Sequence, residues 1–376
     1  MQKTILLKLM PSAKQAETVK ATMRAFNDGA NYVAGEAVAI GTSNKMRLQP
    51  VVYRVLRERF GLSAQMAIRC IAKVCDVYKR DRNKRPTFKP YGAMVHDERT
   101  FSFKGVDRVS LLTLEGRVIV PMVYGEYQAA RLPLAKGQAD LLFRRGKFFL
   151  AATVEIPDGT PMPPTGYLGV DLGIINLATT SDGEVMTGKE VECVRARCAT
   201  LRGALQSKGT KSARRHLRRL SGRERRFKLH INHCISKRLV QIAKDTQRGI
   251  ALEDLKGIRS RSTVRRNQRD RQTKWAFGEL RAFIGYKAKG AGVPVVLINP
   301  AGTSQTCSRC GYNAAANRKS RDLFACQRCG HQAPADLNAA INIACRAAVN
   351  QPIVSTEKVG FIRPPTFLRQ GQSLAL

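Results

Sequence analysis

Four cysteines near the carboxyl-terminal end of the sequence have the spacing of a metal site. They form two Cys-x-x-Cys pairs, each followed by a glycine: Cys307, Cys310 and Gly311, then Cys326, Cys329 and Gly330. The separation between the pairs is typical of a four-thiolate zinc site. Four thiolates leave no open coordination position, so the sequence predicts structural rather than catalytic zinc. The alternatives are two disulfides or four unrelated buried cysteines. His331 follows closely, but the cysteines already complete the shell and we expect this histidine at the surface.

Three acidic residues stand at marked places in apolar segments. Asp171 interrupts an apolar run, Glu253 ends another, and Asp336 opens a helical stretch soon after the last cysteine. An acid within a buried strand is costly unless it is paired or binds a cation. Carboxylates are suitable ligands for Mg²⁺, and two such ions about 4 Å apart can promote phosphodiester hydrolysis. Taken singly, the three acids could instead be a turn residue, a solvated strand end and a helix cap.

The charge of the chain indicates a polyanionic partner. Lysine and arginine total 65 of the 376 residues against 28 acidic residues, a formal charge of +37. A charge of this size repels itself unless a polyanion neutralises it, and nucleic acid is the expected partner. An acidic membrane surface is the alternative. The sequence has no long uncharged apolar run and no lipidation signal, so we expect no membrane partner.

Arginines concentrate in two places that we expect to contact phosphates. One is a long helical segment and the other is the loop after the Glu253 strand, with Arg214, Arg215, Arg218, Arg219, Arg261, Arg265 and Arg266. His216, His230 and His233 lie in the same basic segment, where phosphate contact is favoured over catalysis. The amino terminus does not resemble a secretory signal, and the Cys-x-x-Cys pairs are typical of a reducing, intracellular compartment.

The elements of the amino-terminal half predict a β domain with inserted helices. Residues 3–10 alternate as a strand, and Ser12 with Gln15 makes a capping box for the next helix. Two further helices are predicted at about residues 50–59 and 63–80. Short β segments then fill residues 99–156, separated by glycine-bearing turns, and indicate a small antiparallel barrel or sandwich. A proline-rich stretch after them marks a domain boundary.

The carboxyl-terminal half has the element order of a ribonuclease-H-like α/β fold. A β-hairpin containing Asp171 is followed by one long helical segment, predicted at residues 194–248. A strand ending at Glu253, a helix at residues 275–289 and a strand at residues 294–299 come next, before the cysteines and the Asp336 helix. In that fold the carboxylates converge at one edge of the sheet and hold divalent ions.

These motifs together resemble those of a known family. GVDLGI around Asp171, ALEDL around Glu253, and TSQTCSRCG with CQRCG and ADLNAAINI around Asp336 resemble the three RuvC motifs and the embedded zinc finger of TnpB proteins. TnpB proteins are transposon-encoded relatives of the type V CRISPR effectors. The resemblance is specific from about Gly166 to Ala347 and weaker in the amino-terminal half.

The resemblance implies a multidomain α+β architecture. A wedge β-barrel would carry an inserted helical recognition domain, and a RuvC-like nuclease domain would carry an inserted zinc finger. The implied boundaries are 1–10 and 91–160 for the barrel, 11–90 for the helical domain, 165–300 and 331–350 for the nuclease, 301–330 for the zinc finger, and 351–376 for a disordered tail.

The resemblance also implies an activity. The chain would bind a guide RNA and cleave double-stranded DNA next to a short flanking motif, in the cytoplasm of a bacterium and close to its nucleoid. Asp171, Glu253 and Asp336 would be catalytic and would hold two Mg²⁺ ions, for which Mn²⁺ could substitute. The cysteines would hold structural Zn²⁺, and Arg321 would lie near the scissile phosphate. The oligomeric state stays open.

Three alternatives remain from the sequence. A miniature type V CRISPR effector would share every motif. A guided DNA binder with weak or no cleavage would act as a repressor, although the intact acids argue against it. A zinc-ribbon protein that binds nucleic acid without a guide is the third, and it would be recognised by purifying without RNA.

Overall fold

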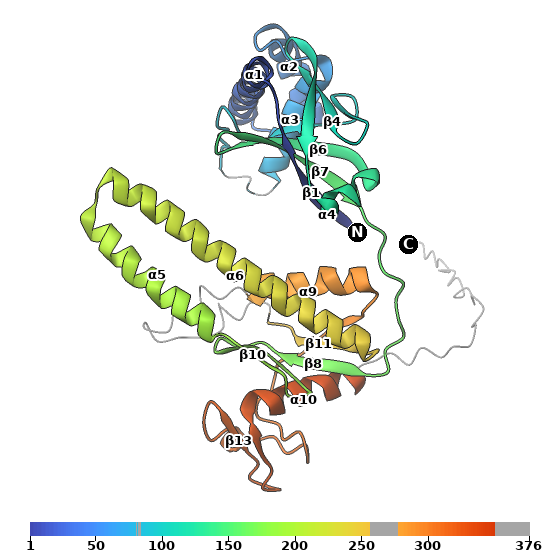
Figure 1. Cartoon of the computed structure of the whole chain (residues 1–376), viewed down its shortest axis with the longest axis vertical. Helices are drawn as coiled ribbons and strands as arrows, with labels where there is room; N and C mark the ends of the chain where they lie inside the picture. Colours follow the sequence, from blue (N-terminus) through green and yellow to red (C-terminus); the bar gives the residue numbers. More distant parts are fainter. Residues whose placement is uncertain (80, 82–83, 256–276, 350–376) are drawn as a thin grey trace, which may run out of the picture. The chain divides into compact units, whose positions relative to one another are not determined.

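The computed structural model describes residues 1–79, 81, 84–255 and 277–349. The chain divides into two units, Met1–Asp158 and Gly159–Leu376, and each has its own hydrophobic core. We describe each unit by itself (Figure 1). Three of the predicted phosphate contacts, Arg261, Arg265 and Arg266, lie outside the described residues, as does the predicted tail.

The first unit contains an antiparallel sheet of seven strands in the order β2-β6-β7-β1-β5-β4-β3. The strands are β1 (Gln2–Leu9), β2 (Met94–His96), β3 (Phe101–Lys104), β4 (Arg108–Thr113), β5 (Gly116–Val123), β6 (Ala135–Arg144) and β7 (Lys147–Glu155). The two edge strands, β2 and β3, are consecutive in the chain and are joined by the turn at residues 97–100. The two edges of the sheet are therefore connected by one short turn, and the sheet is nearly closed. The sequence predicted a barrel or a sandwich for this region.

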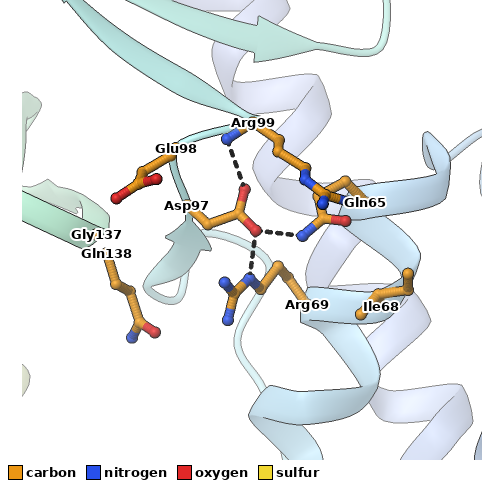
Figure 2. A pocket seen from close by; sticks show the side chains of 8 residues that line it. All are labelled: Gln65, Ile68, Arg69, Asp97, Glu98, Arg99, Gly137 and Gln138. Carbon is orange, nitrogen blue, oxygen red and sulfur yellow. Dashed lines mark hydrogen bonds and ion pairs between the residues drawn. The ribbon is translucent and has the colours of Figure 1, made fainter.

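The turn between the edge strands is fixed by one carboxylate. Asp97 accepts hydrogen bonds from the backbone N–H groups of Arg99 and Thr100, both at 3.2 Å. It also accepts hydrogen bonds from the side chains of Gln65 and Arg69, the latter at 2.8 Å. Figure 2 shows these side chains at a pocket beside the turn. These bonds attach the helix that carries Gln65 and Arg69 to the turn between the two edge strands.

Three helices come between β1 and β2, namely α1 (Ala13–Ala39), α2 (Lys45–Glu58) and α3 (Ala64–Tyr78). The predicted capping box of α1 is confirmed, because Ser12 and Gln15 exchange hydrogen bonds of 3.3 and 3.0 Å. The predicted start of the second helix was wrong. Asn44 caps α2 by accepting from the N–H of Met46, so the helix begins before Pro50, which it contains. A short helix, α4 (Glu126–Ala129), and a 3-10 turn, η1 (Leu132–Leu134), precede β6.

The second unit contains a mixed sheet of five strands in the order β10-β9-β8-β11-β12. The strands are β8 (Tyr167–Asp171), β9 (Asn176–Thr180), β10 (Val185–Thr187), β11 (Gly249–Glu253) and β12 (Val295–Ile298). Strand β9 runs antiparallel to both of its neighbours, β8 and β10, whereas β8, β11 and β12 are parallel. Strands β8 and β11 are buried on both faces, as central parallel strands usually are.

Helices cover both faces of this sheet (Figure 1). The apolar side chains of Leu168, Val170 and Leu252 pack with α6 (Lys211–Asp245) and α9 (Phe277–Ala291). The alternate residues Tyr167, Ala251 and Ile298 pack with α10 (Ala335–Val349) on the other face. Because successive residues of a strand point to opposite faces, the sequence of each strand specifies which helix it contacts.

The predicted long helix after β10 is a helical hairpin instead. Helix α5 (Lys189–Lys208) ends at Gly209, which has a φ of 63°, and Thr210 caps α6 by accepting from the N–H of Ala213. Gly209 adopts a left-handed conformation that other residues disfavour, so it ends one helix and lets the next begin. The prediction of one long helix was wrong at this point, because the Gly209-Thr210 pair ends one helix and caps the next.

The cysteine segment lies between β12 and α10. It contains a 3-10 turn, η2 (Ala315–Asn317), and a two-stranded antiparallel ribbon of β13 (Leu323–Ala325) and β14 (Gln332–Pro334). Its small core includes Phe324, Cys307 and Cys326 together with Ala335 of α10. The segment is therefore packed onto the start of the helix that carries Asp336.

Candidate active site and cysteine cluster

Strand register brings two of the three predicted acids together. Leu252 of β11 is paired with Val170 of β8, so Glu253 and Asp171 follow at neighbouring ends of parallel strands. Asp171 shares its face of the sheet with Gly169, two residues earlier, and Glu253 shares its face with Ala251. Since Ala251 packs with α10, both acids lie on the face that α10 covers.

A glycine allows the third acid to approach. A Cβ atom at Gly169 would lie 2.0 Å from the carbonyl oxygen of Ala340 and 2.6 Å from the backbone nitrogen of Ala344. The backbone of α10 therefore rests directly on β8, which only glycine permits at this position. Asp336 lies one turn before Ala340 on the same helix, near the carboxyl end of β8. The structure thus places all three predicted catalytic acids at one end of one sheet face.

The electrostatics agree with this placement. Burial, followed by the negative charges of Glu253 and Asp336, raises the pKa of Asp171 to about 7, although Arg318 opposes the shift. Burial also raises the pKa of Glu253, against the lowering effects of a hydrogen bond from Thr303 and the charge of Arg346. A buried carboxyl group whose pKa is raised by burial and by neighbouring acids is a recognised mark of a functional site.

Two side chains hold the carboxylates in orientation. Thr303 donates a hydrogen bond of 2.5 Å to Oε1 of Glu253. Asn176, at the start of β9, donates a hydrogen bond of 2.9 Å to Oδ2 of Asp336. Neither residue was identified from the sequence. Thr303 stands in the quoted TSQTC motif and Asn176 follows the quoted GVDLGI motif closely, so their proximity to the motifs was the available signal.

Arg318 is a basic residue near the acids that the sequence did not single out. Arg318 is close enough to Asp171 to lower its pKa, and it donates a hydrogen bond of 3.2 Å to the carbonyl of Arg321. Arg321 itself is exposed. The two arginines are three positions apart in a loop, where spacing alone does not reveal which one faces the acids.

The four predicted cysteines form one cluster. All four sulfur atoms lie within 4.8 Å of one another, with 3.7 Å between Cys307 and Cys329 and 3.6 Å between Cys310 and Cys326. Zinc–sulfur bonds of about 2.3 Å in a tetrahedron place sulfur atoms about 3.8 Å apart, so the cluster fits Zn²⁺. His331 contributes its backbone carbonyl to Cys326 and is not part of the cluster.

Within the described ranges, this cluster is the one set of three or more potential ligand side chains already gathered for a metal ion. The case for a metal at the three acids therefore depends on topology, charge and donor chemistry rather than on closely gathered oxygen atoms. Hard carboxylate oxygens suit Mg²⁺ or Mn²⁺, and a cation would relieve the mutual repulsion that raises the pKa of Asp171.

The arginines of α6 that we expect to contact phosphates are all exposed, namely Arg214, Arg215, Arg218 and Arg219. His216 and His230 are exposed too. His233 is half-buried, and the structure gives it a packing role. Its ring stacks on Phe283 at 4.1 Å and lies within 3.4 Å of the hydroxyl of Tyr286, so it packs α6 against α9.

Two family models match the carboxyl-terminal unit. Residues 151–257 match the model described as a probable transposase of the OrfB_IS605 type, and residues 277–343 match the Cas12f1-like TNB domain. The first match includes Asp171 and Glu253, and the second includes Asp336 and the four cysteines. Both therefore coincide with the site described above.

Curated relatives match part of the chain. A CRISPR-associated endodeoxyribonuclease Cas12f1 from Syntrophomonas palmitatica is 31% identical over 48% of this chain and 39% of its own length. A TnpB-like protein from Methanocaldococcus jannaschii is 40% identical over 25% of this chain and 34% of its own length. The protein named "Putative RNA-guided DNA endonuclease InsQ" from Escherichia coli K12 is 29% identical over 48% of each chain. The matches thus span less than half the length of these relatives.

The fold has a solved counterpart. The structure titled "Cryo-EM structure of the Cas12f1-sgRNA-target DNA complex" aligns with 92% of this chain and 98% of its own, with a TM-score of 0.66 and 13% identity. At this identity the likeness concerns the fold. No helix in the described ranges is long and apolar enough to cross a membrane.

Proposed function

Because its carboxyl-terminal half belongs to the TnpB/Cas12f family, we propose that this chain is an RNA-guided DNA endonuclease. It hydrolyses phosphodiester bonds of double-stranded DNA next to a short flanking motif. The observation that carries the proposal is the convergence of Asp171, Glu253 and Asp336 at one face of the β8–β11 sheet, where α10 also packs against the cysteine segment.

The second unit is a RuvC-like, ribonuclease-H-like domain in this proposal. Its support is the sheet order β10-β9-β8-β11-β12, with an antiparallel hairpin beside parallel strands and acids at the ends of β8 and β11. In the first unit the sheet is the wedge domain (1–10 and 91–160), and the helices between its first two strands are the recognition domain (11–90). The nuclease takes 165–300 and 331–350, and the zinc finger 301–330.

In this proposal, side chains of the chain bind the metal ions, orient the carboxylates and attract the phosphate. Asp171, Glu253 and Asp336 would hold Mg²⁺ or Mn²⁺, and such ions would supply water activation and charge stabilisation of the leaving group. Thr303 and Asn176 fix the directions of two of the carboxylates. Arg318 adds positive charge beside Asp171, where it can attract a phosphate of the bound strand.

The cysteine cluster holds structural Zn²⁺ in this proposal. The ion would close a small segment whose core shares Ala335 with α10, next to Asp336. A segment of this size with few core side chains gains most of its stability from such an ion. Four free thiolates need a reducing environment, which the bacterial cytoplasm provides. The proposed guide RNA and DNA target meet near the nucleoid, so we place the protein in the cytoplasm near it.

Nucleic acid is bound chiefly through phosphates. The formal charge of +37 and the exposed arginines of α6 supply a sequence-independent attraction. Base pairing between guide and target then supplies most of the sequence recognition, as in RNA-guided effectors generally. Arg261, Arg265, Arg266 and Arg321 are included in the proposed phosphate-binding set with Arg214, Arg215, Arg218 and Arg219.

The test is cleavage by the purified chain carrying the RNA with which it purifies. Asp171→Ala should reduce cutting of guide-matched DNA by at least about a hundredfold, because charge stabilisation by the bound ions is worth several kcal/mol. Binding of RNA and DNA should persist. Undiminished cutting by this variant would overturn the assignment of the acids.

A second candidate is a miniature type V CRISPR effector with the same chemistry. This candidate is kept because one relative is named Cas12f1 and another is named TnpB-like. The RNA that copurifies distinguishes the two: a repeat-derived guide indicates a CRISPR array, whereas an RNA that overlaps the transposon end indicates a transposon. A guided binder without cleavage would show neither variant-dependent cutting nor a requirement for Mg²⁺.

A further inference from the structure

We propose that Thr303 is a positioning residue that couples the cysteine cluster to the metal-binding carboxylate of Glu253, through a clamp of two asparagines on α10. The inference rests on the proposed function, because it assumes that Glu253 binds a divalent ion. It assigns a role to three residues outside the three acids and the four cysteines, namely Thr303, Asn338 and Asn342.

The link to Glu253 is a single buried hydroxyl. Thr303 is only 2% exposed, and its Oγ1 lies 2.5 Å from Oε1 of Glu253 and 2.9 Å from the carbonyl oxygen of Pro300. A hydroxyl has one proton to donate, and an ionised carboxylate is the stronger acceptor. The hydroxyl therefore fixes one oxygen of Glu253 and leaves the other oxygen without a hydrogen bond from Thr303.

The link to the cysteine cluster passes through the backbone. Asn342 donates from Nδ2 to the carbonyl oxygens of Thr303 at 2.9 Å and of Thr306 at 2.6 Å. Asn338 donates to the carbonyl of Thr306 at 2.9 Å and accepts from the N–H of Ser308 at 2.9 Å. Thr306 and Ser308 flank Cys307 on both sides, so the clamp holds the first cysteine and Thr303 in one frame.

The same helix carries the third acid. Asn338 and Asn342 are four positions apart and lie on one face of α10, and Asp336 is two positions before Asn338. Both asparagines are buried, at 0% and 6% exposure, and a buried amide is costly unless its hydrogen bonds are made. Closure of the cluster by its metal thus constrains Glu253 through Thr303 and Asp336 through the first turn of α10.

A purely local role for Thr303 is the competing explanation. Its hydroxyl could serve only to close the turn that begins at Pro300. The side chain of Thr306 provides a matched control, because the clamp uses only the backbone carbonyl of this residue, and its Oγ1 donates to the carbonyl of Gly302 at 2.7 Å in the same turn. A turn-closing role predicts similar effects at both threonines, whereas coupling to Glu253 predicts an effect at Thr303 alone.

The experiment measures Mn²⁺ binding to the full, zinc-loaded chain by electron paramagnetic resonance, without any nuclease assay. Thr303→Val keeps the shape of the side chain and removes the hydroxyl. It should weaken Mn²⁺ binding by about tenfold or more, the usual effect of losing a group that orients a metal ligand. Thr303→Ser should restore binding to within about threefold, and Thr306→Val should leave it unchanged. Zinc content is measured for each variant.

The outcomes separate this inference from the proposed function. If Glu253→Gln leaves wild-type Mn²⁺ binding unchanged, the acids are not the metal site and the proposed chemistry fails. If Glu253→Gln abolishes binding but Thr303→Val does not weaken it, the positioning role is overturned. Equal losses in Thr303→Val and Thr306→Val also overturn it. If Thr303→Val loses zinc, the comparison is made with Thr303→Ala, and retained Mn²⁺ binding in that variant contradicts the coupling.

Discussion

Asp171 is the residue whose environment departs most from that of an ordinary surface carboxylate. Its pKa is raised to about 7 by burial and by two neighbouring acids. A raised pKa means that the folded chain holds this proton more tightly than the unfolded chain does. The contribution of the group to stability is therefore full below the unfolded pKa of about 4 and is lost as the pH rises through about 7.

This sign gives a prediction for Asp171→Asn in buffer without Mg²⁺ or Mn²⁺. The variant lacks the ionisation, so its stability relative to the wild type should increase as the pH rises from about 4 to about 8, by at most about 1.4 kcal/mol per pH unit. Hydrogen exchange of the β8 amides in the full chain measures the local free energy of unfolding. A difference that does not change with pH would contradict the placement of the three acids.

Asp182 provides the opposite control. Its hydrogen bond with Arg248 lowers its pKa, so this ionisation stabilises the folded chain at neutral pH and the contribution is lost as the pH falls through the lowered pKa. Asp182→Asn should therefore be less stable than the wild type at neutral pH, whereas Asp171→Asn should be more stable. Equal signs would show that the two sites are not distinguished by their charge partners.

At the residue scale, the sequence indicated the candidate ligands but not the side chains that orient the acids. The cysteines and the acids could be predicted because each spacing or position carries a chemical requirement. Thr303, Asn176 and Arg318 could not, because their partners are 50, 160 and 147 positions away and only the fold brings them together.

At the scale of elements, the contact between β8 and α10 is the one on which the site depends. Gly169→Ala would place a Cβ atom 2.0 Å from the carbonyl of Ala340, so α10 must move away from β8 and carry Asp336 with it. We expect a loss of cleavage of about tenfold or more, since small misplacements of reacting groups are costly. Gly166→Ala has open space at its Cβ and should retain activity.

Guided cleavage rates of the two variants, with zinc content as a check on folding, test this prediction. If Gly169→Ala cuts as fast as Gly166→Ala, then α10 does not position Asp336 as described.

Element types were largely predictable here, because apolar runs that alternate faces specified the strands and their covering helices. The break at Gly209 and the early start of α2 were missed because a single cap residue outweighed a longer periodic pattern.

Helix α6 supports a prediction about affinity. Arg214 and Arg218 are four positions apart, exposed and on one face of the helix. Replacing both with alanine should weaken nucleic-acid binding across all sequences and reduce the slope of log affinity against log salt by about one for each lost phosphate contact. Arg238, which is ion-paired with Glu184, is the control, and Arg238→Ala should leave the slope unchanged.

Filter binding or fluorescence anisotropy over a range of salt concentrations provides the measurement. An unchanged slope in the double variant, together with an unchanged affinity, would remove α6 from the phosphate-binding surface. A loss confined to one target sequence would also contradict the account, because phosphate contacts carry no sequence information.

At the scale of the whole molecule, the charge of +37 agrees with the proposed nucleic-acid partner. The sequence predicted a barrel, and the structure has a nearly closed sheet joined at the Asp97 turn. Closure of a sheet depends on pairing between strands far apart in the chain, which local patterns do not specify. The charge, by contrast, is a sum over the sequence and needed no structure.

The central claim is that the chain cuts DNA where a bound RNA directs it. The most direct measurement is to sequence the RNA that purifies with the full chain, replace its guide segment, and assay cleavage of matched and unmatched DNA with Mg²⁺. The account predicts that cutting follows the new guide, requires a short flanking motif and disappears in Asp336→Asn. Cutting that ignores the guide, or a chain that purifies without RNA, would contradict it.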